Sequence, residues 1–283
     1  MRRVYSIAIC VILLLVSGCS SKTDRKIKDL SSSSSGVRFN AAAYLSFLSD
    51  DPETVEKIIG LLNSDNERLV FISAQILGNR KDPAAVVPLG KLTAHPNQDI
   101  RDRAVQSLGM INTEQTAAYV MNALEDSSDV VRKTAVKMIG VMEYSDGVED
   151  IINSLNDPSA GVRAEAVHTL YKFRENPDAG IVAGYFETPL NDEKPLVRYV
   201  AVQALDYAYP DSAKAARLLM KALDDKSKPV REEAVNSLGK IGYEKAIPRF
   251  KKMHDLEQYD VQIAISEAIK SMTGEDFPAF RGH

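Results

Sequence analysis

One ten-residue phrase recurs along this chain at a nearly constant interval. Its clearest copy is Val-Arg-Glu-Glu-Ala-Val-Asn-Ser-Leu-Gly at residues 230–239, and related copies begin at positions 37, 69, 100, 131, 162, 197 and 261. The starts are 31 to 35 residues apart. A fixed period of this length is typical of stacked repeats, in which each unit packs on its neighbours. The sequence therefore predicts an extended repeat array.

The apolar residues inside each copy have helical spacing. Ala135 and Ile139 follow Val131 at i+4 and i+8, which gives one apolar stripe. Glycine ends the stripe in several copies, where we expect a left-handed residue to close the helix; these glycines are Gly78, Gly109, Gly140 and Gly239. Capping pairs such as Asp82-Pro83 then open a second helix. Since no strand-like alternation is present, the fold class is all-α.

The amino terminus has the layout of an export signal. Arg2 and Arg3 precede an apolar run at 7–16, which is shorter than the roughly 20 residues of a transmembrane helix. The following Val-Ser-Gly-Cys block resembles the lipobox of bacterial lipoproteins, which implies removal of residues 1–18 and acylation of Cys19. An ordinary signal peptide that leaves a free cysteine is the alternative. By resemblance to the sorting rule of bacteria with two membranes, Ser20 favours the outer membrane.

Residues 19–35 are polar and serine-rich, and we expect the lipidated cysteine to be followed by a flexible tether. The repeat array then occupies residues 36–283. Loss of Arg2 and Arg3 from 35 basic residues leaves 33 against 39 acidic ones, so the formal charge moves from -4 to -6. This acidic balance argues against nucleic acid as a partner.

Four repeats contain the spacing Asp-x-x-x-x-Val-Arg. The pairs are Asp126 and Arg132, Asp157 and Arg163, Asp192 and Arg198, and Asp225 and Arg231. Together with the period and the Leu-Gly ending, this pattern resembles HEAT repeats of the short type first noted in phycobilisome lyases, over about residues 36–272. The resemblance implies a right-handed α-solenoid of about seven to eight HEAT-like hairpins, a concave face lined by second helices, and an Asp–Arg ladder between repeats.

The ladder also has a physical rationale. An arginine fork two turns into a helix can reach a carboxylate of the adjacent repeat, while Asp157 before Pro158 can cap its own helix. The alternative is an anion-binding stripe formed by Arg38, Arg101, Arg132, Arg163, Arg198 and Arg231. We predict structural pairing because four of these repeats supply an aspartate.

The sequence lacks the motifs of common enzymes. There is no G-x-S-x-G elbow, phosphate-binding loop or H-E-x-x-H pair, and the four histidines at 95, 168, 254 and 283 are scattered. HEAT-like diiron hydroxylases place His-Glu dipeptides on their helices, and this chain has none. We therefore predict no catalytic residue, no metal and no cofactor.

Aromatic residues concentrate where the repeat spacing is longest. Seven lie within residues 171–209, where Tyr171 and Asp206 also replace the terminal glycine. Aromatic side chains anchor many interfaces, which makes a docking patch the functional hypothesis; its candidate residues are Tyr185, Phe186, Tyr199, Tyr207 and Tyr209. The alternative is that these rings fill a larger core. Phe277 and Phe280 are expected to cap the last repeat.

These features predict a non-catalytic, protein-binding scaffold held at a membrane of the cell envelope by lipid on Cys19. The partner is a protein that the sequence does not identify. Two alternatives remain: a small-ligand carrier or enzyme that uses the concave groove, and a structural envelope spacer.

Overall fold

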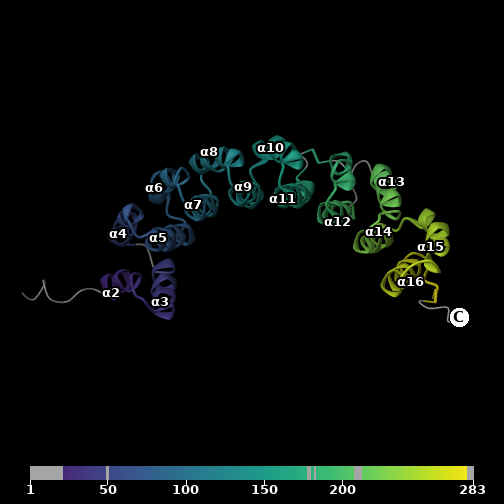
Figure 1. The fold of residues 1–283 in the computed structure, drawn as a ribbon, viewed down its shortest axis with the longest axis horizontal. Coiled ribbons are helices and arrows are strands. Elements are labelled where there is room, and N and C mark those ends of the chain that lie inside the picture. Colours follow the sequence, from purple (N-terminus) through teal and green to yellow (C-terminus); the bar gives the residue numbers. More distant parts are fainter. Residues whose placement is uncertain (1–21, 49–50, 177–179, 182, 207–211, 279–283) are drawn as a thin grey trace, which may run out of the picture. The chain divides into compact units, whose positions relative to one another are not determined.

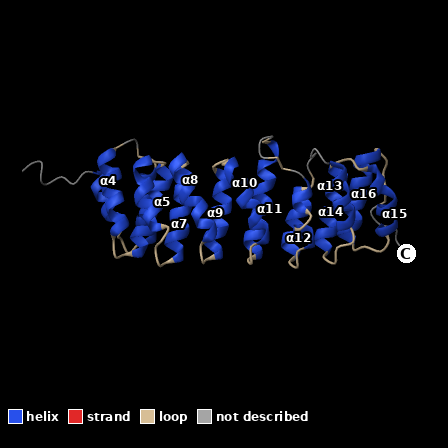
Figure 2. Cartoon of the chain, turned by 90° about the horizontal axis from the view of Figure 1, so that it is seen from above, coloured by secondary structure: helices blue, strands red, loops and turns tan. Residues whose placement is uncertain are grey.

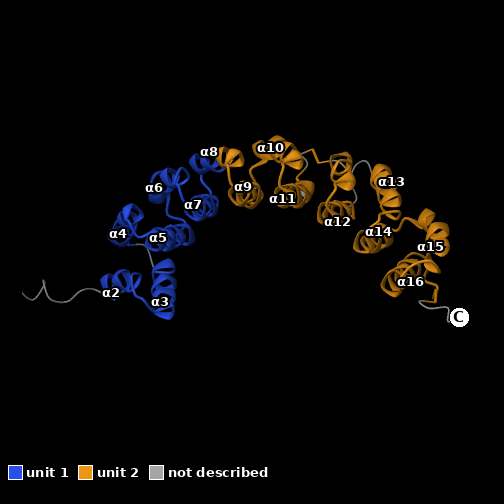
Figure 3. Ribbon diagram, viewed as in Figure 1, with its two compact units in different colours: residues 1–120 blue, residues 121–283 orange. Residues whose placement is uncertain are grey.

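The computed structural model describes residues 22–48, 51–176, 180–181, 183–206 and 212–278, which are helices joined by short turns, with no strand among them (Figures 1 and 2). The chain divides into two compact units, residues 1–120 and 121–283 (Figure 3). In the described ranges no helix combines the length and the apolar character needed to cross a bilayer.

Unit 1 begins with α2 (Lys22–Asp29) and then alternates first and second helices of successive repeats. Its first helices are α3 (Ser35–Ser46), α5 (Glu67–Arg80) and α7 (Gln98–Ile111). Its second helices are α4 (Pro52–Gly60) and α6 (Val86–Leu92), and α8 (Glu114–Asn122) contains the boundary between the units.

Unit 2 continues the alternation. Its first helices are α9 (Asp129–Val141), α11 (Ala160–Lys172), α12 (Pro195–Ala204), α14 (Lys228–Lys240) and α16 (Tyr259–Thr273). Its second helices are α10 (Val148–Asn153), α13 (Ser212–Ala222) and α15 (Ile247–His254). Between α11 and α12 the described residues form only short 3-10 turns, which are η6 (Phe173–Glu175), η8 (Ala183–Phe186) and η9 (Pro189–Asn191).

The predicted apolar stripe is the core of each unit. Val131, Ala135 and Ile139 are buried in α9, as are Val162 and Ala166 in α11. First helices of successive repeats pack directly on one another, from α3 to α7 in unit 1 and from α9 to α16 in unit 2. Second helices pack mainly on first helices. The first helices therefore form a continuous layer within each unit.

The resemblance placed second helices on the concave face, and this expectation is wrong for unit 2. There the first helices lie on the inner side of the curve (Figure 3). Direct contact holds the first helices close together, whereas the second helices are spaced more widely, so the row of first helices is the shorter one.

The sequence pattern predicted that the glycines at the ends of the stripes close the helices, and this prediction is wrong. Gly140 lies inside α9, and the left-handed residue is Glu143, three positions later, with φ 53°. The reason for glycine is close packing, because a Cβ on Gly140 would lie 2.7 Å from Cγ2 of Thr169. Gly78 meets Ser107 in the same way in unit 1, and Gly239 meets Ala268 in unit 2.

This assignment makes opposite predictions for two neighbouring positions. Gly140→Ala should destabilise the protein by about 1 to 3 kcal/mol, because the added methyl group overpacks the contact with α11. Glu143→Gly should stabilise it by about 1 kcal/mol, because glycine adopts the left-handed conformation without a Cβ penalty. Urea unfolding measures both changes. Destabilisation by Glu143→Gly would contradict the assignment of helix closure to position 143.

The predicted flexible tether is also wrong from residue 22 onward. Lys22–Asp29 form α2, and Leu30 is buried against the array. The serine-rich turn is held by Arg38, whose Nη1 donates to the carbonyl oxygens of Ser32 and Ser33 at 2.6 and 2.8 Å. The composition missed this because Leu30 alone supplies the apolar anchor. Cys19 lies outside the described residues.

The carboxyl end folds back on the last repeat, in agreement with the cap predicted for Phe277. The Phe277 ring meets the ring of His254 edge to face, with centroids 5.1 Å apart. Lys270 pairs with Asp276 at 2.7 Å. Phe280 lies outside the described residues.

Candidate functional site

The repeated spacing of the ladder arginines has a structural role inside each repeat. Their Nη1 groups donate to the backbone carbonyl six residues earlier, at 2.6 to 2.9 Å. The arginines are Arg38, Arg101, Arg132, Arg163, Arg198 and Arg231. Each guanidinium thus fixes the turn that enters its own first helix, which leaves fewer of its donors for an external anion.

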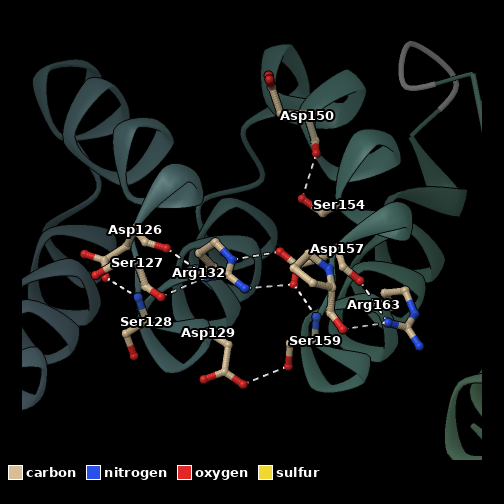
Figure 4. A network of polar contacts seen from close by, with 11 residues as sticks. Asp126, Ser127, Ser128, Asp129, Arg132, Asp150, Ser154, Asp157, Ser159 and Arg163 are labelled. Atoms are coloured by element: carbon tan, nitrogen blue, oxygen red, sulfur yellow. Dashed lines mark hydrogen bonds and ion pairs between the residues drawn. The ribbon is translucent and has the colours of Figure 1, made fainter.

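The same arginines connect successive repeats of unit 2. Nε and Nη2 of Arg132 donate to the two carboxylate oxygens of Asp157 at 2.8 and 2.9 Å (Figure 4). Arg163 binds Asp192 at 2.6 and 2.8 Å, and Arg198 binds Asp225 at the same two distances. Two parallel hydrogen bonds fix both distance and angle between repeats. The arrangement is that of structural pairing.

The aspartates of the ladder stabilise turns but do not cap helices. Asp157 accepts the backbone N–H of Ser159 at 2.7 Å, and Ser159 is the N-cap of α11. The sequence reading of Asp157 as a cap is therefore wrong by two positions. Asp126 accepts from Ser128 at 2.8 Å in the same way (Figure 4). The bond from Ser159 fixes the orientation of the Asp157 carboxylate, which also binds Arg132.

The last rung of the ladder was missed by the sequence reading. Arg231 binds Glu257 through Nε and Nη2 at 2.6 and 2.8 Å. Glu257 lies one position later in its repeat than the aspartates do in theirs, and its extra methylene gives the added reach. Gln262 then occupies the arginine position and donates to the carbonyl oxygen of His254 at 3.0 Å. A search for Asp alone could not find this pair.

The ladder carboxylates titrate at lower pH than free aspartates. Burial acts to raise the pKa of Asp157, Asp192 and Asp225, but hydrogen bonds from arginine and from a backbone N–H, together with the positive charge, hold the pKa of each below its usual value. The ionised form is therefore the one that the fold stabilises.

This electrostatic arrangement sets an expected pH dependence. A carboxylate with a lowered folded-state pKa contributes stability above its unfolded value, about 3.9, and loses it as the pH falls toward the folded value. The free energy of unfolding should thus be insensitive to the ladder above about pH 5 and fall below about pH 4. Urea titrations across this range measure the effect. Asp225→Asn should reduce the acid slope, and an unchanged slope would contradict the assignment.

The structure corrects the predicted aromatic patch. Phe186 is fully buried, so it is a core residue and not a surface anchor. It lies in η8, which packs on α12 and α13. Tyr185 and Tyr199 are half-buried, and Gln203 donates to the hydroxyl of Tyr199 at 3.1 Å. Tyr207 and Tyr209 lie outside the described residues. The described part of the patch therefore presents no large exposed ring.

The residues that replace the terminal glycines contact each other across repeats. The Tyr171 hydroxyl donates to Oδ1 of Asp206 at 3.2 Å, and Nζ of Lys240 binds Oδ2 of the same carboxylate at 2.8 Å. Burial and the negative charge of Asp206 raise the pKa of Tyr171. The adjoining pocket, about 230 Å³, is smaller than typical ligand sites. Tyr171, Asp206 and Lys240 therefore bind one another across the repeats.

Histidines do not converge in the described part of the chain. Nδ1 of His95 accepts the backbone N–H of Asn97 at 3.1 Å, and His168 is exposed on α11. His254 is buried, with Nδ1 3.0 Å from Asp255. His283 lies outside the described residues. Among the residues described, no three His, Cys, Asp or Glu side chains are grouped as a metal site would require.

The geometry defines an all-α solenoid of helical hairpins with a continuous layer of first helices in each unit. The model of HEAT repeats matches residues 72–131, 117–182 and 186–270, which together exceed half of the chain. The chain belongs to the HEAT-repeat family. No curated protein matches it in sequence.

Solved structures with a similar fold include YibA of Escherichia coli, at 20% identity and a TM-score of 0.56 over 84% of this chain and 87% of that one. An engineered protein matches at 19% identity and a TM-score of 0.52, over 89% of this chain and 79% of its own. The complex of CpcE and CpcF of phycocyanin lyase from Nostoc has 18% identity and a TM-score of 0.46, over 90% and 96%. At these identities the likeness concerns the fold alone.

Proposed function

We propose that this HEAT-repeat chain is a lipoprotein, anchored through Cys19 in the cell envelope, whose layer of first helices binds a protein partner without catalysis. The observation that carries the proposal is the direct packing of successive first helices, which makes the faces that they turn away from the second helices one contiguous surface within each unit. A stable protein interface needs roughly 800 Å² on each partner, and adjacent helices supply such an area more readily than separated ones.

The face of this layer that points away from the second helices is exposed to solvent in unit 2. Lys133, Lys137 and Val141 follow one another at i, i+4 and i+8 on α9, and all three are exposed. On α11 the positions of Lys137 and Val141 are occupied by His168 and Lys172, which are also exposed. The ladder does not compete for this face, since its arginines are committed to turns and neighbouring repeats. We expect a partner with a complementary acidic or polar surface.

One observation favours the small-ligand alternative. Unit 1 has an open groove of about 770 Å³ whose lining includes Phe47, Val55, Ile59 and Arg80. Its volume falls within the range of small-molecule sites. Native mass spectrometry of protein purified from membranes would detect a retained ligand, and loss of that ligand on replacement of the half-buried Ile59 with Arg would assign it to this groove.

Replacing Cys19 with alanine should move the protein from the membrane fraction to the soluble fraction or stall its processing. The physical reason is that lipid burial contributes about 0.8 kcal/mol per methylene, so diacylation retains a protein on membranes washed with high salt, which removes electrostatic surface contacts. Fractionation of cells that produce wild type and Cys19→Ala measures the change. Ser20→Ala is the matched control and should retain membrane association. Unchanged fractionation and maturation of Cys19→Ala would contradict the anchor.

A further inference from the structure

Helix α3 has two apolar faces, and only one of them is buried. Ala41 and Leu45 belong to the core, whereas Phe39 and Phe47 are 73% and 84% exposed. Phe39, Ala43 and Phe47 are four residues apart, so they share one side of the helix and form what we call the aromatic stripe. The equivalent positions on α9 are Lys133, Lys137 and Val141. The paired rings are thus a feature of the first repeat.

Helix α2 places positive charge beside this stripe. Lys22, Arg25 and Lys28 are exposed and lie at i, i+3 and i+6, which defines a basic face. Nζ of Lys22 lies 4.6 Å from the ring centroid of Tyr44, which directly follows Ala43 of the stripe. Helix α2 packs on α3, and this contact places Lys22 of the basic face beside the residue that follows the stripe.

The charge of these two helices is opposite to that of the rest of the chain. Residues 22–48 contain five basic and two acidic residues, whereas residues 49–283 contain 28 basic and 37 acidic ones. An anionic surface would attract the first segment and repel the remainder. This asymmetry favours an anionic partner that contacts α2 and α3.

The two helices are also held in place. Lys57 of α4 pairs with Asp24 of α2 at 2.8 Å, and Leu30 is buried. Arg38 of α3 fixes the turn between the helices through Ser32 and Ser33. Residue 22 is three positions from Cys19, a span of at most about 10 Å in an extended chain. A lipid on Cys19 would bring α2 to the headgroup layer.

We propose that the aromatic stripe and the basic face bind the surface of a bilayer that contains anionic phospholipid. Phe39 and Phe47 enter the headgroup region, and Lys22, Arg25 and Lys28 bind lipid phosphates. An apolar face with flanking cations is the composition of interfacial membrane helices. This inference rests on the proposed membrane anchoring, and it adds a second contact that fixes the orientation of unit 1, which a single lipid attachment leaves free to rotate.

The test measures binding to vesicles by a chain that carries no lipid. The mature chain from residue 19, with Cys19→Ser, retains every described residue and is sedimented with vesicles of phosphatidylglycerol and phosphatidylethanolamine or of phosphatidylcholine alone. We expect binding to the anionic vesicles that weakens at high salt. Phe39→Ser and Phe47→Ser should each reduce partitioning by about tenfold. Replacing Lys22, Arg25 or Lys28 with Gln should reduce it by about fivefold each.

The matched control is Leu256→Ser with Tyr259→Ser. It removes from the last repeat two apolar side chains that are 83% and 60% exposed, comparable with Phe39 and Phe47. This control should bind vesicles as the parent chain does. Absence of binding to anionic vesicles, or unchanged binding after loss of Phe39 and Phe47, would overturn the inference and leave the stripe to a protein partner. Because no variant carries lipid, this failure is distinct from failure of the Cys19 anchor, which fractionation of cells reports separately.

Discussion

Phe186→Ala should lower the free energy of unfolding by about 3 to 5 kcal/mol, because the ring is fully buried and its removal leaves a cavity. The ring occupies η8, where short 3-10 turns lie between α11 and α12. A large side chain fills space there that aliphatic residues of a longer helix would otherwise fill. Chemical unfolding followed by circular dichroism gives the change in stability.

Leu196→Ala is the matched control for this substitution. Leu196 lies in the next helix, α12, and is 58% exposed, so its replacement should change stability by less than about 0.5 kcal/mol. A Phe186→Ala protein with unaltered unfolding but weakened partner binding would restore Phe186 to the docking surface. The expected result assigns it to the core.

Arg198→Ala should destabilise unit 2 by about 3 kcal/mol, since it leaves the Asp225 carboxylate without its buried partner. Side-chain exposure of the two residues is 5% and 11%, which makes this the most enclosed pair of the ladder. Arg198 also fixes its own turn by donating to the carbonyl of Asp192 at 2.8 Å. Unfolding of Arg198→Ala, Asp225→Ala and the double variant separates the two contributions by a double-mutant cycle.

An exposed inter-repeat pair of the same unit provides the comparison. Lys228 of α14 pairs with Asp260 of α16, with side-chain exposures of 31% and 55%. Solvent screens this pair, so Lys228→Ala should lower the stability of unit 2 far less than Arg198→Ala does. Equal losses for Arg198→Ala and Lys228→Ala would show that burial and bidentate geometry do not decide the strength of the ladder.

The period and the helical stripe were sufficient to predict the repeat class, because each repeat buries the same face on the next. Val131, Ala135 and Ile139 are buried as their spacing required. Inter-repeat pairs such as Arg132 with Asp157 follow the spacing of the motif. Regular features of this kind can be predicted from the sequence because the same residue pattern recurs in each repeat.

Contacts between distant residues were less readable. Glycine is needed at position 140 because Thr169 of the next first helix lies against it. The sequence pattern does not reveal this contact, so the glycine was assigned to helix closure. Burial of Phe186 depends on the absence of a regular second helix among the described residues before α12. Order in α2 depends on Leu30, Arg38 and Lys57, which serine-rich composition does not reveal.

Photo-crosslinking in intact cells tests the proposed scaffold most directly. A photoreactive amino acid is placed at Lys137 or His168, which are exposed on first helices, and at Glu149 or Lys221, which are exposed on second helices. We predict that the two first-helix positions yield a discrete protein adduct in the membrane fraction and that the second-helix positions do not. Absence of a protein adduct at both Lys137 and His168 would contradict the central claim that the first-helix layer binds a protein partner.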